Sequence, residues 1–214
     1  MWNKQRPRSG LLIVISGPSG SGKTSVIKVL CESDPRLALS ISATTRSPRQ
    51  NEIDGVNYHF LSVSEFEDLI QQDGFLEWAK YGEHYYGTLK SEVESPMAEG
   101  KDLILEIDVQ GAMQLKELDF RSIFIFILPP SSAILEKRLC GRKTESDQEL
   151  QQRLQAARSE VASIKNYDYC VINPDDDIDH AVKQIRYIIS AEKCRMDNQL
   201  LESVVQEFSP LVSS

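Results

Sequence analysis

The sequence predicts an α/β protein whose centre is a parallel sheet flanked by helices. Three observations lead to this prediction: short apolar runs recur along the chain, helical patterns lie between them, and a glycine-rich segment follows the first run. Apolar runs without clean alternation are typical of strands that are buried on both faces. Strands that alternate with helices form parallel sheets with right-handed crossovers.

Each element is predicted from its own pattern. Apolar residues run together, and predict strands, over 11–15, 103–109, 123–128 and 169–172. One helix is expected after the first of these runs and another after the third. Two longer helices are expected over about 150–164 and 178–189, because apolar residues there recur every three or four positions and form one stripe on each helix.

Length and composition exclude several classes of protein. The chain has 214 residues, 41% hydrophobic and 26% charged, which predicts one globular domain rather than a disordered or fibrous chain. Its formal net charge of −8 argues against coating nucleic acid or an anionic membrane, which requires a broad positive surface. No segment approaches the ~18 apolar residues of a membrane span. The widely spaced Cys31, Cys140, Cys170 and Cys194 predict reduced core thiols and a cytoplasmic protein.

The chain is expected to divide into a core, an insertion, a lid and a tail. Residues 1–40 and 89–196 are expected to form the core. Residues 41–88, rich in polar and aromatic residues, predict an inserted mixed α+β region that contacts substrate. A polar stretch between two helices predicts a small helical lid over about 138–155. The tail, 197–214, has apolar residues at helical spacing, so we expect a helix that packs on the parent domain or on a second subunit.

The glycine-rich segment has the pattern Gly, four residues, then Gly-Lys-Ser/Thr. It consists of Gly17, Pro18, Ser19, Gly20, Ser21, Gly22, Lys23 and Thr24. Glycines here let backbone N–H groups converge on phosphate oxygens at the positive end of a helix. In such a phosphate-binding loop, or P-loop, Lys23 is expected to reach the β- and γ-phosphates of ATP, and the Thr24 hydroxyl to hold Mg²⁺. The sequence therefore predicts a P-loop NTPase-type fold.

A P-loop also needs an acidic residue at the end of a neighbouring strand, to hold the metal ion and its waters. The run over 103–109 contains two, Glu106 and Asp108. Both would point the same way on an alternating strand. Asp108, which follows the apolar Ile107, is the preferred candidate, either directly or through water.

The P-loop alone does not distinguish a kinase from a GTPase or a mechanical ATPase, but the inserted region indicates a kinase. Arg46 and Arg49 lie three apart around a proline, and Tyr58 follows. Guanidinium groups match phosphate oxygens, so these residues predict a clamp for a monophosphate. A P-loop kinase of a related sugar phosphate is an alternative.

The motifs together resemble guanylate kinase in its bacterial form. After the P-loop the chain contains Thr-Thr-Arg-x-Pro-Arg, Asp-Gly-x-x-Tyr-x-Phe, Phe-Leu-Glu-Trp-Ala, Tyr-Tyr-Gly-Thr and Ile-Asp-x-Gln-Gly, in that order. They begin at Thr44, Asp54, Phe75, Tyr85 and Ile107. The resemblance extends from about 11 to 196 and does not cover the tail.

The resemblance implies a role for each matching residue. Arg46, Arg49, Tyr58 and Tyr86 would hold the phosphate of GMP, and Ser42, Glu77, Thr88 and Asp108 would contact guanine. Guanine presents a ring N–H beside an exocyclic amine, and a carboxylate accepts from both. Adenine presents a ring acceptor there, which would face the Glu77 carboxylate unfavourably.

The resemblance also assigns the lid. Arg138, Arg142 and Arg153 would reach the triphosphate and the transferred group, and Asn173 would lie near the adenine of ATP. Glu106 departs from the family, in which many members have Asp. The expected reaction is ATP + GMP → ADP + GDP with Mg²⁺, in a monomer or homodimer that binds neither nucleic acid nor membrane. The alternative from another class is a catalytically silent guanylate-kinase-like module that binds a protein.

Overall fold

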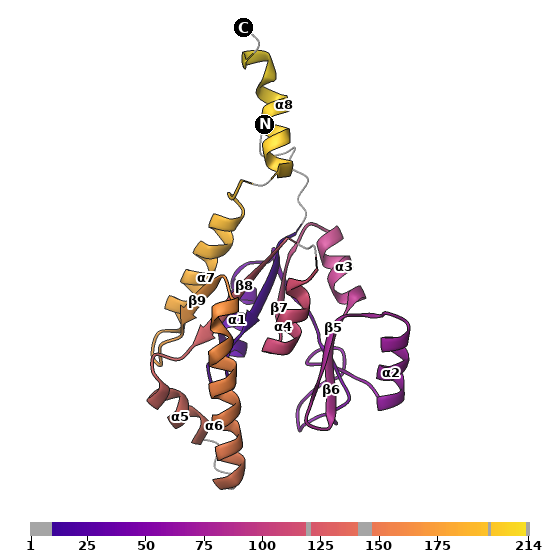
Figure 1. Cartoon of the computed structure of the whole chain (residues 1–214), viewed down its shortest axis with the longest axis vertical. Coiled ribbons are helices and arrows are strands. Elements are labelled where there is room, and N and C mark those ends of the chain that lie inside the picture. Colours follow the sequence, from indigo (N-terminus) through magenta and orange to yellow (C-terminus); the bar gives the residue numbers. More distant parts are fainter. Residues whose placement is uncertain (1–9, 119–120, 141–146, 197, 213–214) are drawn as a thin grey trace.

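A five-stranded parallel sheet lies at the centre of the molecule, with helices on both faces (Figure 1). The computed structural model describes residues 10–118, 121–140, 147–196 and 198–212. The strand order is β2-β7-β1-β8-β9. The strands are β1 (Leu12–Ser16), β2 (Leu37–Leu39), β7 (Asp102–Glu106), β8 (Ser122–Leu128) and β9 (Tyr169–Ile172). The α/β fold and the four predicted strands of this sheet are confirmed, except that the strand expected over 103–109 ends at Glu106 and Val109 already begins a helix. The short β2 was not predicted.

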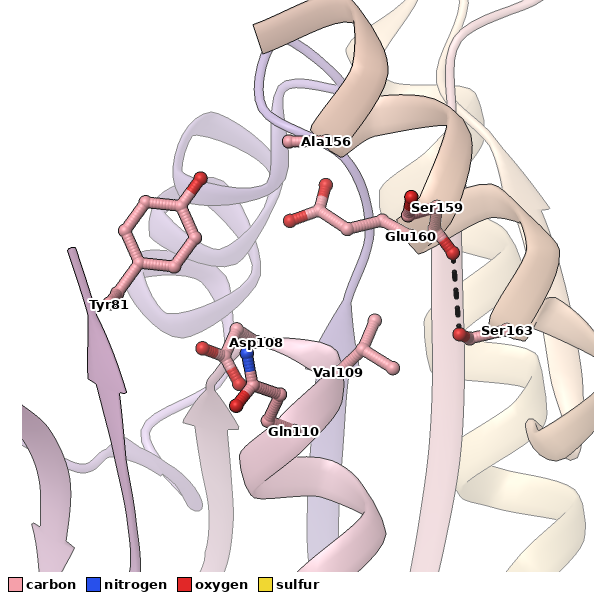
Figure 2. Close-up of a pocket in the computed structure, with 8 residues that line it drawn as sticks. All are labelled: Tyr81, Asp108, Val109, Gln110, Ala156, Ser159, Glu160 and Ser163. Carbon is pink, nitrogen blue, oxygen red and sulfur yellow. Dashed lines mark hydrogen bonds between the residues drawn. The ribbon is translucent and has the colours of Figure 1, made fainter. Parts of the chain in front are cut away.

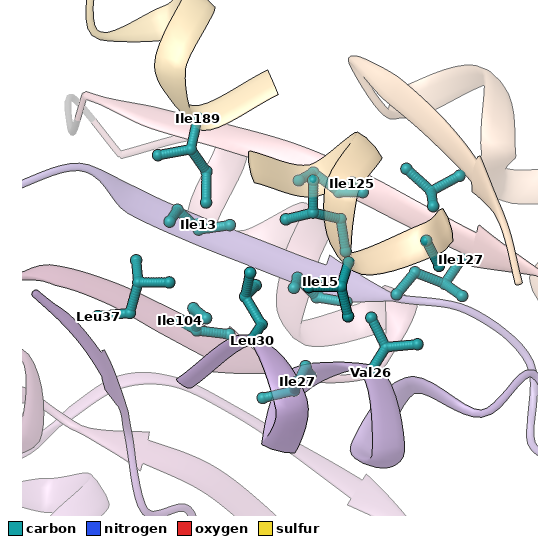
Figure 3. Close-up of a cluster of buried hydrophobic side chains, with 14 of the residues drawn as sticks. Ile13, Ile15, Val26, Ile27, Leu30, Leu37, Ile104, Ile125, Ile127 and Ile189 are labelled. Atoms are coloured by element: carbon teal, nitrogen blue, oxygen red, sulfur yellow. The ribbon is translucent and has the colours of Figure 1, made fainter. Parts of the chain in front are cut away.

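The two faces of the sheet have separate apolar cores, which explains why the strands read as unbroken apolar runs. Ile13 and Ile15 of β1 pack against α1 (Lys23–Ser33) and α7 (Ile178–Glu192), as Figure 3 shows. Leu12 and Val14 point to the other face, toward α3 (Lys90–Ala98) and α4 (Val109–Lys116). Because successive side chains alternate across a strand, both sets of β1 residues are buried.

The inserted region forms a second, four-stranded sheet of order β4-β3-β6-β5. Its elements are β3 (Ala43–Thr44), β4 (His59–Phe60), α2 (Val63–Gln71), β5 (Phe75–Tyr81) and β6 (His84–Leu89). A capping box of Ser62 and Glu65 begins α2, and the Phe66 ring of α2 stacks on Phe75 with centroids 4.2 Å apart. The mixed sheet with its helix agrees with the expected α+β insertion.

Residues 56–61 form only a short strand within this region. Val56 is exposed, and β4 begins only at His59. The preceding residues instead form a turn, in which the Asn57 side chain accepts a hydrogen bond from the Ile53 N–H at 2.9 Å. Local side-chain bonding of this kind competes with strand pairing.

The predicted lid corresponds to α5 (Ser132–Cys140) and α6 (Asp147–Ala162). Leu135 and Leu139 of α5 pack against Ala157 and Leu154 of α6. The short 3-10 helix η2 (Ser163–Asn166) follows α6. Arg142 lies outside the described residues, so its expected approach to the triphosphate stays a prediction.

The tail is helical, as its apolar spacing predicts, but it does not cover the domain. Helix α8 (Asn198–Val212) leads away from the sheet and its helices (Figure 1). Leu201, Val205 and Phe208 are exposed. The expectation that the tail packs on the parent domain is therefore wrong for this structure, because α8 extends beyond the reach of the core. Packing on a second subunit stays a prediction.

The cysteines are free thiols, as expected, but only Cys31 packs against the core. Cys140, Cys170 and Cys194 are exposed, and only Cys31 is partly buried. Cys170 lies on β9, at the edge of the sheet, where alternation turns its side chain away from the core. Among the described helices, none combines the length and apolar character needed to cross a membrane.

Candidate active site

The predicted nucleotide-binding residues meet at the carboxyl edge of the parallel sheet. The P-loop follows β1, Glu106 ends β7 beside it, and Asn173 follows β9. Ile15 and Glu106 are register partners. In open parallel sheets, ligands bind outside the carboxyl ends of the strands. Because the strands run parallel, residues that are far apart in the sequence are brought to the same edge of the sheet.

The P-loop turns directly into α1. Gly22 caps this helix with a φ of 84°, a left-handed backbone conformation that residues other than glycine rarely adopt. Helix α1 begins at Lys23, so its free N–H groups face the loop. A pocket of about 370 Å³ lies here, lined by Ser19, Gly20, Gly22, Lys23, Thr24, Ser25 and Arg138. A helix N-terminus with an open loop of glycines is suited to bind phosphate.

Lys23 is held inside this loop. Its Nζ donates to the carbonyl oxygens of Gly17 at 2.5 Å and Pro18 at 3.3 Å. Burial lowers the pKa of Lys23 below its usual value, while the carboxylates of Glu106, Glu160 and Asp108 act in the opposite direction. The Lys23 ammonium group therefore lies near several carboxylates. A triphosphate bound in the loop would add further negative charge beside it.

Two side chains from elsewhere in the chain hold the back of the loop. Asn173 is buried, and its Nδ2 donates to the Ser21 carbonyl at 2.8 Å. The Arg138 guanidinium contacts the carbonyls of Gly20, Ser21 and Asn173, each at 3.3 Å, and also binds Asp175. Both predicted residues therefore lie at the P-loop, and both fix its backbone.

Glu106 is the acidic residue that contacts Thr24. The Thr24 hydroxyl donates to Glu106 Oε1 at 2.7 Å. Asp108, the preferred candidate from sequence, caps α4 instead, and its Oδ1 accepts the Gly111 N–H at 2.9 Å. Carboxylate and hydroxyl oxygens are the ligands that Mg²⁺ takes in proteins, with phosphates and waters completing its shell. The residues present therefore fit this ion.

The lid helix α6 reaches the P-loop through Ser19. The Arg153 Nη2 donates to the Ser19 Oγ at 3.0 Å. Glu160, seven residues further along α6, accepts the Ser19 N–H, and burial raises the pKa of its carboxyl group. Figure 2 shows Glu160 pointing toward Tyr81 and Asp108 across a pocket of about 240 Å³. No sequence pattern indicated Glu160, because a single acid on a polar helix is usually solvated.

Three of the residues predicted to clamp a phosphate lie close together on the inserted sheet. The Arg46 guanidinium lies 5.4 Å from the Tyr58 ring centroid and 5.8 Å from that of Phe60. The Tyr58 and Tyr86 rings meet edge to face, with centroids 6.3 Å apart. Arg49 is exposed nearby. The structure thus brings Arg46, Tyr58 and Tyr86 together.

Glu52, which the sequence analysis missed, organises this clamp. Its carboxylate binds Arg46 through two bonds of 2.9 Å and accepts the Arg49 N–H at 2.6 Å. Hydrogen bonding from Arg46 lowers the pKa of Glu52. Asn51 has a φ of 73°, and this turn brings Glu52 back to both arginines. The signal available in the sequence was an acid six residues after Arg46.

Of the predicted base-reading residues, Thr88 binds the buried Glu77 carboxylate and Asp108 lies close enough to act on its charge. Glu77 on β5 and Thr88 on β6 are direct partners across the antiparallel pair, and Thr88 Oγ1 donates to Glu77 Oε1 at 2.7 Å. Burial raises the pKa of Glu77 to about 7, and the charge of Asp108 adds to this. Ser42 lies just before β3, with its carbonyl bound to the His59 N–H. The Glu77 carboxylate has one oxygen bound by Thr88 and can accept further hydrogen bonds from a ligand.

The fold and the site together define a P-loop protein with a phosphate cradle on one side and a basic, tyrosine-lined clamp and buried acid on the other. Comparison with known proteins assigns the family. The guanylate kinase family model matches residues 9–192. The chain belongs to the guanylate kinase family.

Individual relatives agree with this assignment. A guanylate kinase from Caldanaerobacter subterraneus subsp. tengcongensis is 53% identical over 190 residues, 89% of this chain and 91% of the relative. One from Clostridium perfringens is 48% identical over 211 residues, 97% of both chains. The crystal structure of guanylate kinase from Anaplasma phagocytophilum superposes with a TM-score of 0.75 at 28% identity, covering 95% of this chain and 97% of that one. The predicted family is therefore confirmed.

Proposed function

We propose that this chain catalyses ATP + GMP → ADP + GDP, with ATP in the P-loop and GMP on the inserted sheet. The observation that supports this most directly is the buried Glu77 carboxylate, held by Thr88 on the opposite side of the site from an intact P-loop. A carboxylate in this position matches the adjacent ring N–H and exocyclic amine of guanine. Family membership supports the same reaction.

Recognition of GMP is assigned to two groups of residues. Glu77, Thr88, Ser42 and Asp108 would contact the base, and Arg46, Arg49, Tyr58 and Tyr86 would hold its phosphate. AMP would bring a ring nitrogen lone pair against Glu77 and leave the buried charge unmatched. Sites that depend on hydrogen bonds to a buried group discriminate strongly against analogues that lack the partner.

Phosphoryl transfer is assigned to positioning and charge. Lys23 would bind the β- and γ-phosphates, and Arg138, Arg142 and Arg153 would approach the transferred group from the lid. Arg46 and Arg49 would hold the accepting phosphate in line. Such reactions are accelerated almost entirely by orientation and electrostatic stabilisation. We propose direct transfer, without a covalent intermediate on the protein.

Thr24 with Glu106, and Asp108 directly or through water, would hold Mg²⁺. When bound, this ion neutralises charge that develops on the phosphates. Thr24 is the second residue of α1, directly after Lys23, so the same helix end orients both the hydroxyl and the ammonium group.

The proposed organisation keeps the boundaries of 1–40 with 89–196 for the core, 41–88 for the insertion and 197–214 for the tail. We propose a cytoplasmic monomer or homodimer with ATP and GMP as its small-molecule partners. The test for oligomeric state is sedimentation of the full chain, and an assembly larger than two copies would contradict the proposal.

The reaction is tested by ADP release with ATP and Mg²⁺, offering GMP, dGMP, AMP, UMP and CMP in parallel. Turnover confined to GMP and dGMP is expected. Turnover with another acceptor would contradict the base-reading assignment. No turnover from folded protein that still binds GMP would favour the alternative, a silent protein-binding module, although Gly17, Gly22, Lys23 and Thr24 are all intact.

A further inference from the structure

Gly111 lies against the carboxylate of Glu77, at a place where a helix would otherwise favour a side chain. It is the third residue of α4 and donates its N–H to Asp108, the cap of this helix. A Cβ built on Gly111 would lie 2.9 Å from Glu77 Cδ and closer still to Oε2. Alanine forms helices better than glycine, so helix formation does not explain the glycine.

The Glu77 carboxylate is confined from its other side. Its Oε1 accepts from Thr88 at 2.7 Å, and the side chain is buried. Strand β5 is fixed to α4 at the next residue, because the Gln114 amide donates to the Trp78 carbonyl at 2.7 Å and accepts the Trp78 N–H at 3.3 Å. Since Gln114 lies one helical turn after Gly111, the two backbones are held together where Gly111 faces Glu77.

A methyl group added at Gly111 can therefore be accommodated in one way, by movement of the Glu77 side chain. Neither β5 nor α4 is free to separate, but the Glu77 carboxylate is the end of a flexible side chain. It would rotate away from the methyl and leave its position beside Thr88. The fold would survive this movement, whereas a base that pairs with both carboxylate oxygens would lose its partner.

We propose that Gly111 is a specificity-determining positioning residue, whose missing side chain leaves the space in which Glu77 is held for guanine. This inference rests on the proposed function of Glu77. Gly111 also binds Asp108 through its N–H, so a single residue sets the relative position of both acids. It acts through Glu77 and contacts neither reacting phosphate.

The test is Gly111→Ala in the full chain, measured with GMP and with IMP, whose base lacks the exocyclic amine. A displacement of about 1 Å in a positioned group costs about 100-fold, so we expect kcat/KM for GMP to fall about 100-fold and the preference for GMP over IMP to shrink. KM for ATP should change less than about twofold, and the urea midpoint should stay equal or rise because alanine favours the helix. Loss of stability, or equal damage to both substrates, would overturn the inference.

Two further variants separate this inference from the proposal on which it rests. Gly82→Ala adds a methyl that meets no atom within 4 Å and should keep the preference for GMP; because Gly82 has a φ of 62°, this variant is a control for substrate preference and not for stability. In a Glu77→Ala background, Gly111→Ala should have almost no further effect, since contacting residues are non-additive. If Glu77→Ala leaves GMP use unchanged, the proposed role of Glu77 fails. If Glu77→Ala impairs GMP use and Gly111→Ala does not, only the inference on Gly111 fails.

Discussion

Replacing Glu77 by Gln should stabilise the protein while weakening its binding of GMP. Glu77 is 5% exposed, and burial raises its pKa from 4.5 to about 7. Each pKa unit corresponds to about 1.4 kcal/mol, so the ionised carboxylate costs the folded protein about 3 kcal/mol. The glutamine amide keeps the shape of the side chain and an oxygen for the Thr88 hydroxyl, but carries no charge.

The sign of the pH dependence follows from the raised pKa. The folded protein holds a proton on Glu77 that the unfolded chain releases, so the contribution of Glu77 to stability is complete below pH 4.5. It is lost as the pH rises through about 7. The gain from Glu77→Gln should therefore be largest at pH 8, about 3 kcal/mol or roughly 6–12 °C in Tm, and small at pH 5.

The assay is urea or thermal unfolding of both proteins from pH 5 to pH 8, with the exposed Glu94→Gln on α3 as a control for the change in net charge. GMP titrations at pH 8 should show affinity reduced at least about tenfold, because hydrogen bonds to a charged acceptor contribute about 1.5–3 kcal/mol. A stability gain that is the same at pH 5 and pH 8 would refute the reasoning. So would unchanged stability with unchanged GMP affinity.

Three other changes test other parts of the molecule. Lys23→Ala should abolish turnover while GMP still binds in a titration, and undiminished turnover would remove Lys23 from the mechanism. Glu52→Gln should free Arg46 and raise KM for GMP about tenfold with KM for ATP nearly unchanged; a similar rise in both constants would contradict a role confined to the clamp. Phe126→Ala removes a fully buried ring of β8 and should cost about 3–5 kcal/mol in urea unfolding, whereas a loss below about 1 kcal/mol would mean that the core does not depend on it.

Sequence patterns predicted the elements and most of the residues gathered at the site. The apolar run of β1 with the glycine-rich loop after it predicted the phosphate cradle, because both depend on local backbone chemistry. The family motifs predicted Arg46, Tyr58 and Tyr86 as one clamp, and the structure brings these three together. These features consist of short patterns with fixed spacing, so they can be recognised in a single sequence.

Partners that are distant in sequence could not be read in this way. Glu106 rather than Asp108 meets Thr24, because the register of β7 against β1 places Glu106 beside Ile15 at the edge of the sheet. Likewise, the outward course of α8 leaves Leu201 exposed, although its apolar spacing alone suggested packing on the domain.

The sequence by itself determined the sheet, the P-loop and the family of this protein, because those depend on periodicity and on short contiguous motifs. Only the tertiary structure decided which carboxylates are buried, paired or free to read a ligand. The reason is physical: burial and pairing depend on segments that approach from different parts of the chain. Glu77 owes its raised pKa to burial, to which the charge of Asp108 adds and which the hydrogen bond from Thr88 opposes, and no spacing in the sequence reports that enclosure.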